Sequence, residues 1–267
     1  MTLATIKQLF TYPIKGLTPQ AMSEFALTAG HGIKGDRAFA LLFTDYLEGA
    51  KMPADRASWI SKKYLAVQND WPLLAALECH YQPETAVLIV KRQGVALLSA
   101  ETNTTAGRDR ISTFFTDYLA TIEPTKEAKH PQLAPLRLVG NISGETRYPD
   151  RAPVHISLVS QATLDRLTEV AQQNIDAGRF RPNIVLEGVS AWSEFELVGQ
   201  QFQLGTALIE VTARIGRCVN IEVNPQTGDR DIPLLSLLQQ EFGHAQTGVL
   251  AKIINSGTVK IGDSLNS

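Results

Sequence analysis

Cys218 is the side chain of this 267-residue sequence best suited to reactive chemistry. It is one of two cysteines, and it follows the strand-like run 207–211 with Arg214 and Arg217 close by. Neighbouring positive charges favour the thiolate over the neutral thiol, and the thiolate is the reactive form. Its sulfur could therefore act as a nucleophile, as a redox switch or as a ligand for a soft metal. A small buried hydrophobe is the structural alternative for a free cysteine.

The other cysteine, Cys79, carries no such signal. It lies in the strand-like segment 77–81 without a basic neighbour, so we predict a structural role. A cysteine–histidine hydrolase built on Cys218 would need His155 or His244 as a base in space, and no family signature surrounds the thiol. The sequence thus gives little support to hydrolytic chemistry.

Three loops carry positive charge elsewhere in the chain. They are 12–16 with Lys15, 30–37 with Lys34 and Arg37, and 179–183 with Arg179 and Arg181. Each alone is typical of a solvated turn. Together with Arg217, and in a chain whose net charge is only −2, they indicate a local site for an anionic, phosphate-bearing ligand.

The segment 30–35 also matches the dinucleotide-binding pattern GxGxxG, but its context does not fit. Those glycines should open a helix after a buried strand, whereas residues 36–43 continue as an apolar, strand-like run. We therefore predict a tight loop between two strands, whose glycines permit left-handed backbone.

The composition sets outer limits on function. The 25 basic and 27 acidic residues nearly cancel, so no global field attracts a nucleic-acid polymer or an anionic membrane. The first ten residues lack the features of a signal peptide, and no apolar run reaches the roughly 20 residues that span a bilayer. Two cysteines cannot form a disulfide framework, which favours a reducing, cytoplasmic setting. Without CxxC, HExxH or a four-cysteine pattern, we expect no iron–sulfur centre.

The first third of the chain alternates like sheet. Its short apolar runs lie too close together for crossover helices, so we predict antiparallel strands in a barrel or bent sheet. These strands are 6–10, 25–28, 38–43, 85–90 and 95–98. Residues 111–122 show the spacing of an amphipathic helix, and the Pro- and Lys-rich stretch 123–151 is the expected connection between two domains.

The second part combines strands with two helices. The predicted strands are 154–159, 183–187, 200–204, 207–211, 219–223, and a last pair, 249–254 and 259–261, joined as a hairpin. Ser160 is the expected N-cap of a helix that reaches Ile175, with Gly178 as its C-terminal cap. Residues 234–242 form a second amphipathic helix. The whole is predicted to be α+β with β dominant.

Six short motifs, taken in order, resemble one family. They are Tyr-Pro-Ile-Lys at 12–15, Gly-Asp-Arg-Ala-Phe at 35–39, Phe-Arg-Pro-Asn-Ile at 180–184, Arg-Cys at 217–218, Asn-Pro-Gln-Thr-Gly at 224–228, and Gly-Val-Leu-Ala with Ile-Gly-Asp between 248 and 263. The set is similar to the MOSC proteins, named for the molybdenum cofactor sulfurase C-terminal domain. It resembles most the two-part type, which includes the mitochondrial amidoxime-reducing component and bacterial reductases of N-hydroxylated bases.

The resemblance implies an N-terminal MOSC-associated β-barrel domain at 1–125 and a β-barrel-like MOSC domain with helices at 126–267. It also implies a molybdenum cofactor (molybdopterin) whose metal is bound by the pterin dithiolene and by Cys218. Cationic and polar side chains are expected to hold the phosphate-bearing pterin. The matching positions are Lys15, Arg37, Arg181 and Asn183, with Arg217 beside the thiol and Ser160, at a helix N-terminus, near the phosphate.

Two departures from the family pattern accompany this assignment. Gly16 stands where many relatives have a serine that contacts the cofactor. Some bacterial relatives carry a ferredoxin domain after the MOSC domain, whereas this sequence stops at Ser267. Electrons are therefore expected from a separate electron-transfer protein.

The predicted function is a molybdenum cofactor-dependent oxidoreductase that cleaves the N–O bond of an N-hydroxylated small molecule. Cys218 would bind and tune the metal, and the basic loops would orient the cofactor. Asp231 is interpreted as a turn residue rather than a member of the site. The alternative is a non-catalytic protein that carries the cofactor, or sulfur, on Cys218.

Overall fold

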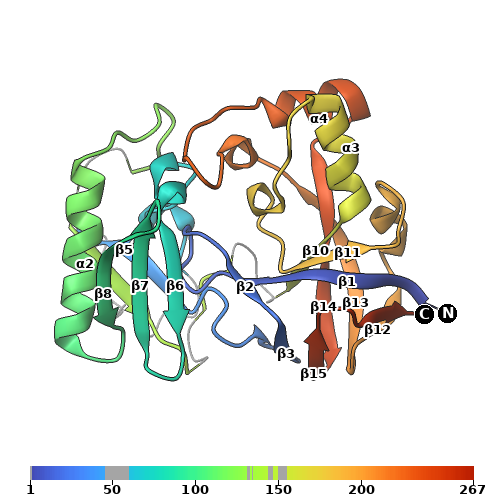
Figure 1. The fold of residues 1–267 in the computed structure, drawn as a ribbon, viewed down its shortest axis with the longest axis horizontal. Coiled ribbons are helices and arrows are strands. Elements are labelled where there is room, and N and C mark those ends of the chain that lie inside the picture. The colour runs from blue at the N-terminus through green and yellow to red at the C-terminus, as the bar shows by residue number, and fades with distance from the viewer. Residues whose placement is uncertain (1, 46–59, 131–132, 134, 144–146, 150–154) are drawn as a thin grey trace.

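The chain folds as a β-dominated α+β protein, as predicted (Figure 1). The computed structural model describes residues 2–45, 60–130, 133, 135–143, 147–149 and 155–267. Within these ranges it contains three α-helices, and none of them is long and apolar enough to cross a membrane. Thr2 pairs with Asn266, so the first and last strands are neighbours and both ends of the chain lie at one side of the molecule.

A closed barrel of seven strands organises much of the C-terminal half. In order around the barrel these are β11 (Ile184–Glu187), β10 (Ile156–Ser160), β14 (Gln246–Asn255), β13 (Ala207–Gly216), β12 (Gln201–Leu204), β16 (Ser264–Asn266) and β1 (Thr2–Thr11). The ring closes because β1 pairs with β11 as well as with β16, and β2 (Gln20–Met22) continues the sheet from β1. Apolar side chains such as Ile6, Leu186 and Ile209 fill the interior. Closure leaves the barrel strands without free edges.

Two helices and short 3₁₀ turns form a second layer against β10 and β11. The layer comprises α3 (Gln161–Ala171), α4 (Leu234–Phe242), and the turns η4 (Ala177–Arg179), η5 (Ser193–Leu197) and η6 (Val219–Glu222). Val159 and Val185 pack into this layer, whereas the preceding residues of each strand, Leu158 and Ile184, point into the barrel. Because successive side chains of a strand point to opposite faces, β10 and β11 contribute to both the core of the barrel and the core of the helical layer.

Helix α3 starts after Ser160, as predicted, but ends earlier than predicted. Its C-cap is Gln172, whose φ of 52° lies in the left-handed region. Gly178 belongs to the separate turn η4, where its N–H donates to Asp176 Oδ1 at 2.6 Å. The prediction that Gly178 caps the helix is therefore wrong, because the chain leaves the helix at Gln172 and a second, independently capped turn follows.

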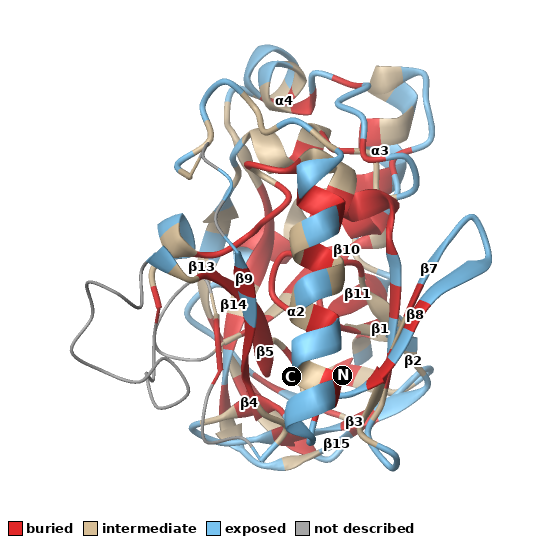
Figure 2. Cartoon of the chain, turned by 90° about the vertical axis from the view of Figure 1, so that its left-hand side faces the viewer, coloured by how far each residue is buried: buried red, intermediate tan, exposed pale blue. Residues whose placement is uncertain are grey.

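The N-terminal half packs a helix against small antiparallel sheets. One sheet is β5 (Phe39–Phe43) with β9 (Leu136–Gly140), the other is β6 (Glu78–Gln82), β7 (Val87–Arg92) and β8 (Val95–Glu101), and the turns η2 (Lys62–Tyr64) and η3 (Pro72–Ala76) lie between them in sequence. Helix α2 (Thr105–Ala120) presents one buried stripe to this core (Figure 2). It begins six residues before the predicted start, because Thr104 caps it by accepting from Gly107 N.

A further sheet connects the two halves of the chain. It consists of β4 (Gly32–Ile33), β3 (Glu24–Thr28) and β15 (Gly257–Lys260), so a C-terminal strand pairs with an N-terminal one. The predicted hairpin between 249–254 and 259–261 is therefore wrong, since β14 pairs with β10 and β13 while β15 pairs with β3. The predicted strand 219–223 is also wrong, because these residues form the turn η6.

The GxGxxG segment is a strand connection, as predicted. β3 and β4 pair in antiparallel fashion on either side of Gly30, and β5 rather than a helix follows.

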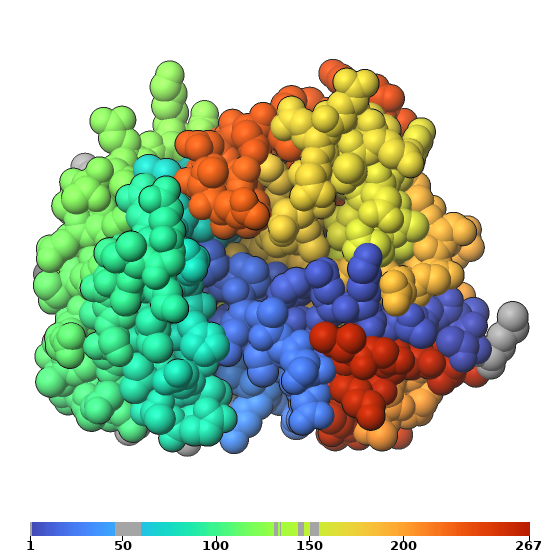
Figure 3. Space-filling view, viewed as in Figure 1, coloured from blue at the N-terminus to red at the C-terminus, as the bar shows by residue number. Residues whose placement is uncertain are grey.

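Figure 3 shows the first residues of the chain, in blue, between the green N-terminal part and the yellow-to-red C-terminal part. The division at residues 125 and 126 stays a prediction. Val154, the first residue of one predicted strand, and parts of the expected connection lie outside the described residues.

Candidate functional site

The basic loops and the Cys218 segment meet at one pocket of about 380 Å³, a volume typical of small-molecule sites. Each loop follows the end of a strand or turn: 12–16 follows β1, 180–183 follows η4, and 217–218 follows β13. The lining therefore comes from both halves of the chain. Predicted residues on this lining are Lys15, Arg37, Arg181, Asn183, Arg217 and Cys218.

Cys218 lies at the end of β13, where the chain turns into η6, and its side chain is exposed to the pocket. Its Sγ lies 3.8 Å from Asn69 Oδ1. Exposure excludes the alternative of a buried hydrophobe. Cys79, in contrast, is buried on β6, and burial raises the pKa of its thiol to about 12. That thiol is neutral at physiological pH, in agreement with the predicted structural role.

Arg217 is held beside the thiol by backbone carbonyls. Its Nη1 donates to Phe180 O at 2.9 Å, its Nε donates to Thr247 O at 2.9 Å, and Nη2 also contacts Thr247 O. Burial lowers the pKa of Arg217 to about 10, so the guanidinium stays charged at neutral pH. Carbonyls fix its orientation but do not neutralise it, and a guanidinium with five N–H donors keeps some of them for a ligand.

Arg37 and Arg181 both lie over the ring of Tyr12, with their Cζ atoms 4.7 and 4.3 Å from the ring centroid. The Tyr12 hydroxyl donates to Pro182 O at 3.1 Å, and Arg181 Nη1 donates to Leu17 O at 2.6 Å. Both arginines have a φ of 53°, a left-handed conformation that is uncommon outside glycine and often marks a functional site. The two cations are thus placed on one aromatic platform at some conformational cost.

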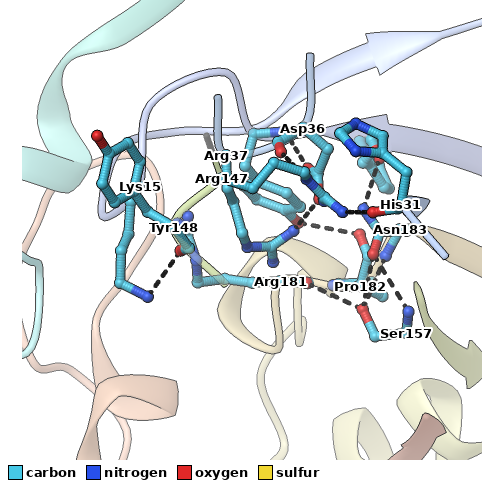
Figure 4. A network of polar contacts seen from close by, with 12 residues as sticks. Lys15, His31, Asp36, Arg37, Arg147, Tyr148, Ser157, Arg181, Pro182 and Asn183 are labelled. Carbon is cyan, nitrogen blue, oxygen red and sulfur yellow. Dashed lines mark hydrogen bonds and ion pairs between the residues drawn. The ribbon is translucent and has the colours of Figure 1, made fainter. Parts of the chain in front are cut away.

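Asp36 organises the polar network behind this platform. Its buried carboxylate accepts from Tyr12 N at 2.9 Å, Arg37 Nη1 at 2.5 Å and Arg147 Nη2 at 3.1 Å. Burial lowers the pKa of Arg147, and the adjacent Asp36 acts in the opposite direction. One carboxylate therefore serves two guanidiniums, as Figure 4 shows.

Positive charge dominates the described residues that line the pocket. The cationic side chains are Lys15, Arg37, Lys62, Arg147, Arg179, Arg181 and Arg217, and Asp36 is the carboxylate among them. Lys15 is 4% exposed, and its Nζ donates to Tyr148 O at 3.1 Å. Clustered cations in a partly desolvated pocket repel one another, and an anion relieves that cost. The electrostatics fit a phosphate-bearing ligand.

Arg179 is the cation of the lining that forms a two-pronged ion pair with Asp231. Its Nη2 donates to both carboxylate oxygens of Asp231, at 2.7 and 2.8 Å. Burial alone would raise the pKa of Asp231, but the hydrogen bonds from Asn224 and Arg179 outweigh it and lower that pKa. Arg179 Nε is buried without a hydrogen-bond partner among the described residues. Asp231 itself is not among the lining residues, in line with its interpretation as a turn residue.

Asn183 lies on the lining, and its amide is engaged with the neighbouring strands. Its Oδ1 accepts from the N–H and the hydroxyl of Ser157, both at 3.2 Å, and its Nδ2 donates to Phe10 O at 3.2 Å. These bonds connect β10 and β1 at the edge of the pocket (Figure 4). Asn183 therefore positions the walls of the site.

Ser160 lies outside the pocket, and its predicted place near a phosphate finds no support. It is fully buried, and its hydroxyl donates to Val189 O at 3.2 Å. The carboxylate of Glu194 accepts from Ser160 N at 3.4 Å and from Thr163 Oγ1 at 2.9 Å. The protein's own carboxylate thus occupies the N-terminus of α3, the place where a helix attracts an anion.

Several residues of the lining escaped the sequence reasoning. They are Lys62, Gln68, Asn69 and Arg147. His155 also lines the pocket, but the sequence reasoning considered it only as a base for a hydrolase. Arg147 falls in the stretch interpreted as a connection, and Gln68 and Asn69 carry no charge or motif. Only the charge of Lys62 and Arg147 offered a sequence signal for any of them.

The possible metal ligands of the pocket fit a metal only as part of a larger cofactor. The described residues contain no cluster of three or more His, Cys, Asp or Glu side chains that could hold a bare ion. Cys218 offers one soft sulfur ligand, and the surrounding cations, with the unpartnered Arg179 Nε, offer donors for anionic oxygens. These residues fit a metal whose remaining ligands come from a phosphorylated organic cofactor.

Comparisons with known proteins match both halves of the chain. A model of the MOSC N-terminal beta barrel domain matches residues 3–130, and a model of the MOSC domain matches residues 144–266. The mitochondrial amidoxime-reducing component 1 of Mus musculus is 25% identical, over 98% of this chain and 81% of the mouse protein. Mitochondrial amidoxime reducing component 2 of Rattus norvegicus is 36% identical over 35% of this chain, but only 27% of the rat protein is covered.

Among solved structures, the YUAD protein from Bacillus subtilis aligns over 99% of this chain and 94% of that chain, with 12% sequence identity and a TM-score of 0.45. The YiiM protein from Geobacillus stearothermophilus aligns over 49% of this chain and 66% of that chain, with 21% identity and a TM-score of 0.34.

Proposed function

This chain belongs to the MOSC domain proteins with an N-terminal MOSC β-barrel domain, and from that premise we propose that it is a molybdenum cofactor-dependent oxidoreductase that reduces N-hydroxylated substrates. The observation that carries the proposal is one exposed thiol, Cys218, on the wall of a cationic pocket. Relatives named for amidoxime reduction support the substrate class.

The proposed cofactor is molybdopterin with molybdenum, held at Cys218. When bound, this group supplies a metal centre that exchanges two electrons and accepts an oxygen atom. The Cys218 sulfur suits such a soft metal, and its deprotonated form is the ligand. Lys15, Arg37, Arg181 and Arg217 would hold the anionic oxygens of the cofactor, while Asn183 keeps the walls of the pocket in place.

The proposed reaction is R₂N–OH + 2 H⁺ + 2 e⁻ → R₂NH + H₂O. The N–O bond breaks and the nitrogen is reduced; one proton goes to the hydroxyl oxygen, which leaves as water, and the other goes to the nitrogen. The two electrons come from a separate electron-transfer protein. Because the Cys218 side of the pocket is exposed, water can deliver the protons there. The cationic walls balance negative charge on the cofactor, and they help to orient it.

A location in the cytoplasm is part of the proposal. Both cysteines are free, and neither Cys79 nor Cys218 has a disulfide role. A catalytic thiol that serves as a metal ligand needs a compartment that keeps it reduced.

The test compares metal content with turnover. Protein purified from a host that makes molybdenum cofactor is analysed for molybdenum and assayed with benzamidoxime and a chemical electron donor. We expect molybdenum bound in stoichiometric amount to the chain and steady formation of benzamidine. Bound molybdenum without turnover of any N-hydroxylated compound would favour the alternative, a protein that carries the cofactor or sulfur on Cys218.

A further inference from the structure

Asn69 brings an amide from the N-terminal half of the chain to the reactive sulfur. It lies 149 residues before Cys218 in sequence, yet its Oδ1 is 3.8 Å from Cys218 Sγ, and both residues line the pocket. We propose that Asn69 contacts the substrate, and that its side-chain carbonyl selects N-hydroxylated compounds carrying an O–H or N–H donor at the N–O group. This inference rests on the proposed function.

The orientation of the amide follows from its neighbour. Asn69 Nδ2 donates to Asp70 Oδ1 at 3.0 Å. An ionised carboxylate can only accept hydrogen bonds, so the amide nitrogen of Asn69 faces Asp70 and the amide oxygen faces the sulfur. Asp70 is itself 2% exposed and fixed, because its Oδ2 accepts from Lys129 N at 3.0 Å and its carbonyl accepts from Thr125 N at 2.8 Å. The carbonyl oxygen is thus presented to the pocket by a rigid support.

The backbone of Asn69 is held as firmly as its side chain. Arg230 Nη2 donates to Asn69 O at 3.1 Å, and Thr125 Oγ1 donates to the same oxygen at 3.4 Å. Arg230 comes from the C-terminal half, close to η6, so the two halves of the chain together place this amide. Fixed polar groups beside a reactive atom discriminate between ligands better than mobile ones.

The Asn69 carbonyl has capacity for a donor besides the thiol. Cys218 Sγ lies 3.8 Å from Oδ1, and a thiol is a weak donor. An amide oxygen has two lone pairs, so it can accept a further and stronger hydrogen bond. A compound that reacts beside this sulfur comes within reach of the carbonyl. The N–OH of a hydroxylamine or the NH₂ of an amidoxime can donate to it, whereas the N-oxide of a tertiary amine has no donor.

A site that offers an acceptor rejects analogues that lack the donor, because its polar group is then left unpaired. The discriminating substrates are therefore benzamidoxime, which has donors, and pyridine N-oxide, which has none. Wild-type protein should bind and reduce benzamidoxime in preference to pyridine N-oxide. Asn69→Leu keeps the volume of the side chain, removes the carbonyl, and should reduce that preference.

The experiment measures binding, metal content and turnover in the molybdenum-loaded protein. For Asn69→Leu we expect the Kd of benzamidoxime, measured by calorimetry without an electron donor, and its KM to rise about tenfold, the value of one hydrogen bond. Molybdenum content and the constants for pyridine N-oxide should stay the same. Asn174→Leu makes the same change at an exposed position after α3 and should leave both substrates unaffected.

Arg230→Met provides a second variant that does not touch the pocket amide. It removes the bond to Asn69 O and should lower the preference in the same direction by a smaller factor. This variant decides the question if Asn69→Leu fails to retain the metal: an unchanged preference in Arg230→Met would then overturn the inference.

Two further outcomes would overturn it. Equal losses for both compounds in Asn69→Leu would mean that Asn69 supports the cofactor or the fold, and no loss for either would mean that it does not meet the substrate. A loaded wild-type protein that reduces neither compound would refute the proposed function itself, and that result is visible before any variant is made.

Discussion

Replacement of Asp36 by asparagine tests whether the cationic pocket is held together by one buried carboxylate. Asp36 is 1% exposed, and its carboxylate meets two guanidiniums, Arg37 at 2.5 Å and Arg147 at 3.1 Å. Asp36→Asn keeps the shape of the side chain and an oxygen for the Tyr12 N–H. It removes the only charge that balances those guanidiniums among the described residues of the lining.

The expected loss in the free energy of unfolding follows from the burial of Asp36 and Arg147. Removing one partner of a buried ion pair costs about 3–5 kcal/mol, because the remaining charge stays desolvated and unpaired. Arg147 is 6% exposed, so water compensates little. A protein of this size loses roughly 2–4 °C in Tm per kcal/mol, so Asp36→Asn should lower the Tm by about 10 °C.

The assays are thermal and denaturant unfolding, both followed by circular dichroism, on protein from a host that makes no molybdenum cofactor. Glu169→Gln is the matched control, since it removes the same kind of charge from the exposed Arg166–Glu169 pair, whose side chains are 53% and 66% exposed. The control should change the free energy of unfolding by about 0.5 kcal/mol or less. If Asp36→Asn proves no more destabilising than this control, the account of Asp36 as the charge centre of the pocket is refuted.

Three other perturbations test separate parts of the structure. Cys218→Ser should abolish molybdenum loading, measured by elemental analysis. Cys79→Ser is the control, which should load normally and lose at most some stability. Normal loading of Cys218→Ser would contradict the assignment of Cys218 as the metal ligand. Gly16→Ser should lower the free energy of unfolding by roughly 2–3 kcal/mol in a denaturant titration, because φ is +81° and a Cβ would lie 2.8 Å from Ala66 O; an unchanged midpoint would contradict this. Burial raises the pKa of Glu194 above 4.5, so the folded state binds more protons there than the unfolded state, and this contribution to stability is lost as pH rises from 4.5 through the folded pKa. Glu194→Gln should therefore flatten the fall in stability across that range, and parallel pH profiles of the two proteins would show that Glu194 is not its source.

Local signals identified the charged members of the site. Cys218 and Arg217 are adjacent in sequence, and the loops with Lys15, Arg37 and Arg181 each carry their cation on a short connection. An anion site in a nearly neutral chain needs such loops, so their convergence could be inferred before any geometry was known. The strands that end at these loops were also predictable, because alternation of apolar residues is a property of a few consecutive positions.

Local signals did not predict which distant segments supply the partners of Ser160 and of β15. Ser160 does precede a helix, but the carboxylate that meets its N–H comes from Glu194, 34 residues later. The turn at 255–257 resembles a hairpin connection, yet β15 leaves β14 and pairs with β3, where Lys260 faces Glu24. A turn motif fixes only the bend; the partner of the strand that follows depends on which edge of sheet is open.

The sequence by itself determined the pattern on which the proposed chemistry rests: one cysteine flanked by cations, with further basic loops, in a β-dominated chain. Only the tertiary structure decided the rest of the pocket, since Asn69 reaches Cys218 across 149 residues and Arg147 reaches Asp36 across 111. Charge and periodicity are properties of neighbouring residues, whereas an uncharged amide gains its role from the atoms that fold against it. That is why Cys218 could be identified from sequence and Asn69 could not.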